Sequence, residues 1–201
     1  MGQQAWRRGG ALLGISLGAS LTVGWLGLGT AIAHTPATTP PLDAPADAVP
    51  ELPPFTGYTL PQTFAISIPD GWWVTGSEQT ASAVITSYAP EAAAIAPTDV
   101  KTEVILVPEA PDTYVARQID DLIAGDYVID RYGLAAVKGN EAFRLWIIEQ
   151  PGDFAQRVIT FVGYDNGTTA QIVSYYNDES PTTIETILAI HRSFELVSAA
   201  E

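Results

Sequence analysis

The sequence predicts an α+β fold, in which a mainly antiparallel sheet carries packed helices within a single domain. Two observations lead to this class. Short strand-like segments follow one another through turn signals from Phe64 onward, and two segments have the apolar spacing of helices. The strict alternation of strand and helix that marks a parallel α/β sheet does not occur in this order of elements.

Three strands are expected in the first half of the domain. Phe64–Ile68 alternates large apolar with small residues and stops at Pro69-Asp70-Gly71, a turn sequence. Ala83–Tyr88 and Thr102–Val107 are also strand-like, and the second is so apolar that we expect it in the centre of the sheet. The alanine-rich stretch from Pro90 to Pro97 is bounded by prolines and is expected to be a loop.

Two helices are expected. From Pro111 to Ala124 the apolar residues fall on one face and the charged residues on the other, and Gly125 suits the end of the helix. The second helix begins at Ser180-Pro181, an N-cap followed by proline at the first helical position. Its apolar residues recur at helical spacing, with His191 on the same side, and Phe194-Glu195-Leu196 closes the domain.

Two hairpins are expected between these helices, because paired strand-like segments flank short turn sequences there. They are Leu134–Lys138 with Ala142–Glu149 around Gly139-Asn140, and Arg157–Tyr164 with Thr169–Tyr176 around Asp165-Asn166-Gly167. The residues expected in the core are Ile66, Ile68, Val104, Leu106, Leu122, Trp146, Ile159, Phe161, Ile187 and Leu188.

The first 33 residues have the pattern of an export signal. Arg7 and Arg8 precede an uncharged run that ends in Ala31-Ile32-Ala33, a motif that signal peptidases cleave. The run is also long enough to span a bilayer, so a retained membrane anchor is the alternative. We predict cleavage before His34, export to a thylakoid lumen, a periplasm or the extracellular space, and membrane contact only through an uncleaved signal.

A proline-rich spacer follows the signal. Eight of the fifteen prolines lie between His34 and Pro61. Proline removes a backbone donor and favours extended conformations, so this stretch is not expected to join a core. The chain is therefore divided into an export signal at 1–33, a disordered Pro/Ala-rich linker at 34–61 and one α+β domain at 62–197.

Composition excludes several classes of chemistry. The chain has no cysteine, which excludes disulfides, thiolate metal ligands, thiol catalysis and a lipid-modified N-terminal cysteine. Without the signal, 7 basic residues face 23 acidic ones, a formal net charge of −16. That charge repels nucleic acid and anionic lipid headgroups, so neither is expected as a partner, whereas it suits solubility or contact with a basic protein surface.

The chain offers few catalytic or metal-binding residues. His191 is either a base or ligand, or a partly buried histidine whose charge suits the C-terminus of its helix, and we favour the second interpretation. Within the domain at 62–197, no Gly-x-Ser-x-Gly elbow accompanies it. The aspartates between Asp120 and Asp130 do not form a calcium-binding loop. We therefore expect no catalytic residue, no metal and no cofactor.

The residues expected to contact a partner are Trp72, Trp73 and His191. Trp72 and Trp73 are adjacent at a strand end, where neighbouring side chains point to opposite faces. Both indoles therefore cannot easily face the core, and one is available to bind another protein.

Three motifs point to a family. They are Phe64-x-Ile66-x-Ile68-Pro69-x-Gly71-Trp72, Ile119-x-x-Leu122-Ile123 and His191-Arg192-Ser193-Phe194-Glu195. In these motifs and in its order of elements the chain resembles the PsbP family of oxygen-evolving accessory proteins, and the wider superfamily that includes the bacterial envelope protein DcrB.

The resemblance implies a PsbP-like α/β/α sandwich and a non-enzymatic role in accessory binding or assembly, with photosystem II on the lumenal side as the first candidate partner. Two features depart from family members that attach to photosystem II: the chain has no acylated cysteine, and a proline-rich spacer replaces a basic docking segment. A general envelope binding protein of the DcrB type is the alternative, and a hydrolase that depends on His191 is a further one.

Overall fold

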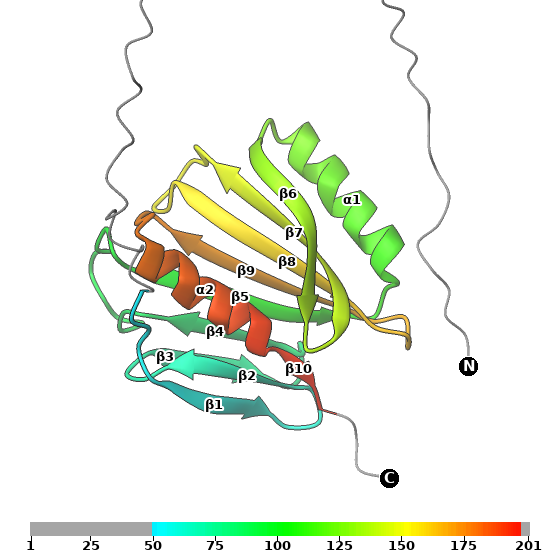
Figure 1. Cartoon of the computed structure of the whole chain (residues 1–201), viewed down its shortest axis with the longest axis horizontal. Coiled ribbons are helices and arrows are strands. Elements are labelled where there is room, and N and C mark those ends of the chain that lie inside the picture. The colour runs from blue at the N-terminus through cyan, green and yellow to red at the C-terminus, as the bar shows by residue number, and fades with distance from the viewer. Residues whose placement is uncertain (1–49, 198–201) are drawn as a thin grey trace, which may run out of the picture. The chain divides into compact units, whose positions relative to one another are not determined.

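The computed structural model describes residues 50–197, which form two helices and ten strands in two antiparallel sheets (Figure 1). A three-stranded sheet has the order β1-β2-β10, and a seven-stranded sheet has the order β3-β4-β5-β9-β8-β7-β6. This arrangement confirms the predicted α+β class. The strands are β1 (Phe55–Leu60), β2 (Phe64–Pro69), β3 (Trp73–Ser77), β4 (Ser82–Thr86), β5 (Val100–Val107), β6 (Val128–Val137), β7 (Asn140–Ile148), β8 (Gln156–Gly163), β9 (Thr169–Tyr176) and β10 (Glu195–Leu196), and the helices are α1 (Pro111–Ala124) and α2 (Pro181–Ser193).

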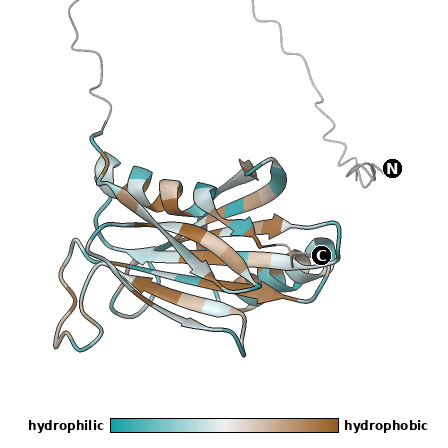
Figure 2. Ribbon diagram, turned by 90° about the horizontal axis from the view of Figure 1, so that it is seen from below, coloured by the Kyte–Doolittle hydropathy of each residue, from teal (hydrophilic) through white to brown (hydrophobic). Residues whose placement is uncertain are grey.

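The seven-stranded sheet has a different cover on each face. Its inner face packs against the small sheet and α2, which together enclose the main core. Its outer face packs against α1 over the strands β7, β8 and β9. In Figure 2 the apolar segments run along the strands of both sheets. The largest side chains that are fully closed to solvent are Tyr176, Phe64, Phe161, Phe194, Ile85 and Leu145.

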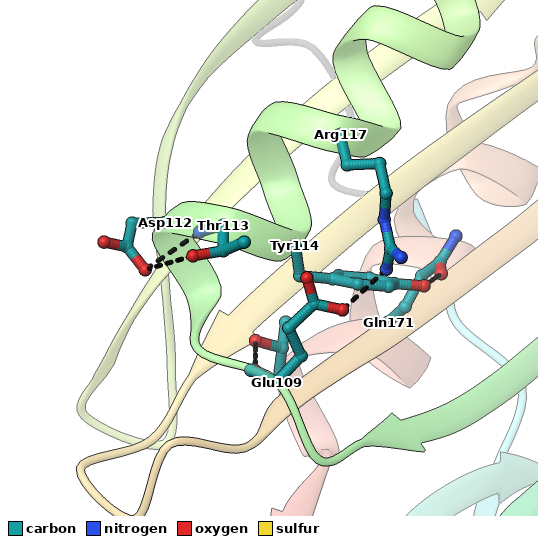
Figure 3. Close-up of polar contacts among 7 residues, drawn as sticks. Glu109, Asp112, Thr113, Tyr114, Arg117 and Gln171 are labelled. Carbon is teal, nitrogen blue, oxygen red and sulfur yellow. Dashed lines mark hydrogen bonds and ion pairs between the residues drawn. The ribbon is translucent and has the colours of Figure 1, made fainter.

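Helix α1 has the predicted bounds and is fastened at its N-terminal end (Figure 3). The Tyr114 hydroxyl donates to the side chain of Gln171 on β9, and the Arg117 guanidinium lies 5.2 Å from the centre of the Tyr114 ring. Arg117 also pairs with Glu109 at 2.6 Å. A Cβ on Gly163 would lie 2.8 Å from Cγ of Pro111, so the first turn of α1 sits directly on the backbone of β8.

Helix α2 begins and ends with serine side chains. Oγ of Ser180 accepts a hydrogen bond from the backbone N–H of Thr183, as the predicted N-cap requires. At the other end, Oγ of Ser193 donates to the Ile190 carbonyl and accepts from the backbone N–H of Ser67 on β2. The second contact ties the C-terminus of α2 to the small sheet.

Strand β1 lies inside the stretch that the sequence assigns to the linker. Phe55–Leu60 pairs with β2 along its whole length, so the predicted linker boundary at residue 61 is wrong. Pro53, Pro54 and Pro61 flank β1 without interrupting it, which leaves its backbone donors available for pairing. The predicted signal at 1–33 and most of the linker lie outside the described residues.

Strand β3 was not expected either. It is a five-residue edge strand, and within residues 50–197 its strand partner is β4. Exposed and half-buried residues do not alternate regularly along it, as they would in a half-buried strand. The first predicted hairpin is correct, but its turn is Lys138-Gly139, one residue earlier than expected. Both residues have positive φ, 48° and 83°, as the tight two-residue hairpin turn needs.

Most of the expected core residues are buried, including Val104 at 1% and Ile187 at 1% exposure. Leu106, Trp146 and Leu188 are half-buried, and the first two pack against the edges of the core clusters. Among residues 50–197, no helix is long and apolar enough to cross a membrane.

Candidate functional site

The two adjacent tryptophans lie on different sides of the seven-stranded sheet. Trp72 is half-buried and packs against the inner-face core. Trp73 begins β3, stands opposite Thr86 of β4 and is 44% exposed. As expected from the alternation of strand side chains, only one indole packs into the core, and Trp73 is the one presented to solvent.

Trp72 lines an open hollow of about 550 Å³ beside the N-terminus of α2. The other apolar walls come from Leu52, Pro53 and Pro54, where the chain enters the domain, and from Val100. Hydroxyl groups of α2 threonines complete the lining, and Glu51 is its charged residue. The hollow suits an apolar or cationic side chain of a protein partner better than an anion.

Part of the outer face is not covered by either helix of residues 50–197, and we call this part the open face. It consists of the outward residues of β3, β4 and β5: Trp73, Thr75, Val84, Glu103 and Ile105. Thr75, Val84 and Glu103 stand opposite one another in register across the three strands. Trp73, Val84 and Ile105 form a diagonal line through them and are 44%, 38% and 39% exposed.

A polar cluster borders the open face. Nζ of Lys101 lies 2.6 Å from Oε1 of Glu103, and the Tyr175 hydroxyl donates to Oε2 of the same carboxylate at 3.2 Å. Lys101 thereby compensates the charge of Glu103, the acidic residue of the open face. Residues 50–197 carry 20 acidic and 7 basic side chains, so a field of negative sign surrounds this surface.

His191 lies in a different place from the one expected. It is fully buried between α2 and the inner face of the sheet, so a partner does not contact it and the expected partly buried position is wrong. Nδ1 of His191 lies 2.8 Å from Oγ1 of Thr160, and Nε2 lies 2.9 Å from Oγ of Ser174. Two hydroxyl groups on β8 and β9 hold the imidazole on both nitrogens.

This contact is the centre of a buried polar row that crosses four neighbouring strands. Nε of Arg144 on β7 donates to Oγ1 of Thr160 at 2.8 Å, and Ser174 shares a hydrogen bond of 2.6 Å with Thr102 on β5. All five side chains are buried. The sequence contains one hint of this row, since Thr102, Arg144, Thr160 and Ser174 interrupt otherwise apolar strands, but it does not place them beside His191.

The surroundings hold His191 in its neutral form. Burial, together with the nearby positive charge of Arg144, keeps the pKa of the imidazole well below its usual range. Burial also lowers the pKa of the Arg144 guanidinium, and Nη2 of Arg144 has no hydrogen-bond partner among the described residues. A neutral imidazole avoids a second positive charge in the same enclosed space.

The pair Ser174 and His191 resembles part of a hydrolase site only in its contact distance. Both side chains are closed to solvent at 0% exposure, so a substrate does not reach them in this structure. A hydroxyl group, Oγ1 of Thr160, stands at Nδ1 of His191, where a hydrolase triad places a carboxylate. The geometry therefore supports a role for the row in packing.

Within residues 50–197, no three side chains of histidine, aspartate or glutamate come together as ligands for a metal ion. Asp120 and Asp121 lie on α1, Asp126 lies in the connection that follows it, and Asp130 lies on β6.

No protein-family model and no curated protein matches this sequence. Similar solved structures include the cyanobacterial PsbP (CyanoP) of Synechocystis sp. PCC 6803, with 13% identity and a TM-score of 0.44 over 71% of this chain and 92% of that one. A protein of unknown function from Pseudomonas aeruginosa, described as a putative regulator, has 14% identity and a TM-score of 0.42 over 73% and 99%. A structure from Bacteroides thetaiotaomicron has 12% identity and a TM-score of 0.41, and the match covers 69% of this chain and 47% of that one.

Proposed function

We propose that the protein is an exported, non-enzymatic accessory protein of the PsbP type that binds another protein through its open face. The observation that carries this proposal is the exposed diagonal of Trp73, Val84 and Ile105 on a part of the sheet that α1 does not cover. Tryptophan is enriched among the residues that dominate binding energy at protein interfaces. A sheet face that presents an exposed tryptophan beside two aliphatic side chains is suited to contact with another protein.

The charge of the domain indicates the partner's chemistry. Acidic residues outnumber basic ones by 20 to 7 in residues 50–197, so the complementary surface is basic with an apolar centre. Photosystem II or one of its assembly intermediates, on the lumenal side of the membrane, is the first candidate. This choice rests on the sequence motifs given above. The proline-rich spacer would let an exported domain reach such a complex without being fixed to it.

Cosedimentation with purified photosystem II lacking its extrinsic subunits tests the proposal. The chain from residue 34 onward should bind at low salt and bind less as salt rises, because exposed charges are screened beyond a Debye length of ~8 Å at physiological ionic strength. Trp73→Ala should reduce the association constant at least tenfold, since a hot-spot truncation costs about 2 kcal/mol or more.

Ile123→Ala is the matched control, because Ile123 is an exposed apolar residue on α1, outside the open face. This variant should bind photosystem II as the unchanged chain does. An equal fall of the association constant in both variants, or no binding of the unchanged chain at low salt, would contradict the proposal. Binding to a periplasmic membrane complex instead, still lost in Trp73→Ala, would favour the envelope protein of the DcrB type.

A further inference from the structure

The strand β6 forms a free edge of the seven-stranded sheet and is exposed over most of its length (Figure 1). Its only strand partner within residues 50–197 is β7. Natural proteins protect such edges with charges, proline or a bulge. In β6 the bulge between Ile129 and Arg131 protects only the first half.

The second half of β6 has no charge, proline or bulge, and α2 contacts the strand from the inner face of the sheet. Its sequence from Tyr132 to Val137 is Tyr-Gly-Leu-Ala-Ala-Val, with no charge and no proline. Tyr132 is 72% exposed and Leu134 is 90% exposed, the two largest exposures among the large apolar side chains of residues 50–197. Both stand on the outer face, opposite Leu145 and Phe143 of β7.

The turn of the β6–β7 hairpin shows which backbone groups face outward. A two-residue turn makes its flanking residues, Val137 and Asn140, a hydrogen-bonded pair. Hydrogen-bonded and non-bonded pairs alternate along an antiparallel ladder. The N–H and C=O groups of residues 132, 134 and 136 are therefore directed away from β7, toward the free edge.

We propose that β6 pairs antiparallel with β6 of a second copy of the chain, around a two-fold axis at Gly133. This register places Tyr132 opposite Leu134 of the second copy and Leu134 opposite its Tyr132. These are the residues whose backbone groups face outward, so each pair can exchange two hydrogen bonds. The same pairing covers the most exposed apolar side chains on one face, and one sheet continues through both copies.

The position of the axis fits the residue that occupies it. Gly133 would face Gly133 of the second copy in a non-hydrogen-bonded pair, where the Cα atoms approach to ~4.5 Å. A Cβ built on Gly133 meets no atom of the described residues within 4 Å, so there is room for a side chain at the axis. The surface is thus complementary to itself, as a two-fold interface requires.

The composition of the paired segment also favours a second copy as the occupant. From Tyr132 to Val137 there is no charged residue, so the pairing brings no like charges opposite one another in this segment. A foreign strand would have to supply its own apolar side chains opposite Tyr132 and Leu134. The second copy supplies them in the register that its own backbone groups set, which is why we choose it as the occupant.

Sedimentation of the chain from residue 34 onward tests the pairing, since this piece contains the compact unit Ala46–Glu201. As the protein concentration is raised from about 1 to about 500 µM, the chain should pass reversibly from monomer to dimer. It should tighten in about 0.5 M salt, because salt screens the repulsion between two acidic domains. Leu134→Lys should abolish the dimer, since lysine on an edge strand opposes pairing.

The matched control is Ile105→Lys, which places the same charge on the open face and should leave the dimer unchanged. A chain that sediments as a monomer at every concentration and salt would overturn the proposal. A dimer that survives Leu134→Lys and dissociates in Ile105→Lys would overturn it as well. Both residues are exposed, so neither change is expected to unfold the domain.

A cysteine scan tests the register, because the chain has no cysteine of its own. Gly133→Cys should form a disulfide-linked dimer on mild oxidation, since its Cα atoms would lie within the ~4.4–6.8 Å that disulfides span. Ala135→Cys lies two residues further along β6 on the same face. Its Cα atoms would be roughly 13 Å apart, so it should not cross-link. Equal cross-linking of both variants, or none in Gly133→Cys, would contradict the axis at Gly133.

This inference does not depend on the proposed function. The two surfaces lie at different ends of the sheet, and salt acts on them in opposite directions, since it weakens contact with a basic partner and strengthens contact between two acidic copies. Loss of one interaction therefore leaves the other measurable.

Discussion

Nε2 of His191 lies 2.9 Å from Oγ of Ser174, with both side chains closed to solvent. The contact joins the C-terminal half of α2 to the centre of the seven-stranded sheet. The imidazole in this contact stays neutral in the folded chain, because burial and the nearby Arg144 keep the pKa of His191 low. The stability of the fold is thereby linked to pH.

The free energy of unfolding should fall as pH drops below about 6.5, the pKa of an unfolded histidine. Below that pH the unfolded chain binds a proton at His191 and the folded chain does not. The stability that comes from the buried neutral imidazole is therefore present at higher pH and is lost as the pH falls. The slope from this group is at most about 1.4 kcal/mol per pH unit. His191→Gln removes the titration.

Denaturant unfolding of both chains from about pH 7.5 to about pH 5 measures this effect. The unchanged chain should lose stability relative to His191→Gln as pH falls. A stability difference that stays constant over this range would mean that His191 titrates normally in the folded chain.

Arg144 should contribute little to stability as a cation. Its guanidinium is buried, its pKa is lowered by burial, and Nη2 has no partner among the described residues. Arg144→Met keeps the volume without a buried charge and should leave the free energy of unfolding within about 1 kcal/mol or raise it.

Thr160→Val is the contrasting change, because it removes the hydroxyl that Arg144 and His191 share. It should cost about 1–3 kcal/mol, the cost of leaving buried polar groups without partners. Thermal or urea denaturation of both variants distinguishes them, and a larger loss in Arg144→Met than in Thr160→Val would show that the charge itself stabilises the fold.

Ile187→Ala should destabilise the domain by about 2–5 kcal/mol, because Ile187 is 1% exposed on the buried side of α2. Leu188→Ala, on the half-buried side of the same helix, should cost clearly less. Equal losses by urea denaturation would mean that α2 is rotated relative to the structure described above.

The fold could be predicted from sequence where the signals are local. The bounds of α1 follow from its apolar stripe, with Pro111 and Gly125 at its ends, and the start of α2 follows from Ser180-Pro181. The sequence does not predict β1 and β3, because short, exposed edge segments have little periodicity. These strands are held by their pairing with β2 and β4.

The candidate site was less accessible to sequence reasoning. The adjacency of Trp72 and Trp73 correctly predicts that one of them is exposed, but the diagonal of Trp73, Val84 and Ile105 depends on the register of three strands. The buried row depends on the same kind of information. Thr102, Thr160 and Ser174 become neighbours of His191 only through pairing between distant segments.

Export can be tested separately from the fold. N-terminal sequencing of the exported protein should begin His-Thr-Pro at His34, because Ala31-Ile32-Ala33 ends the uncharged run. Recovery of Met1 or Gly2 in a membrane fraction would establish a retained anchor instead.

The central claim is that the open face binds a basic protein surface. The measurement that tests it most directly is the association constant with photosystem II as a function of salt, for the unchanged chain and for Trp73→Ala. We predict that binding weakens steadily with salt, and that Trp73→Ala lowers the constant at least tenfold at every salt concentration. Binding that is insensitive to both salt and Trp73→Ala would contradict the claim.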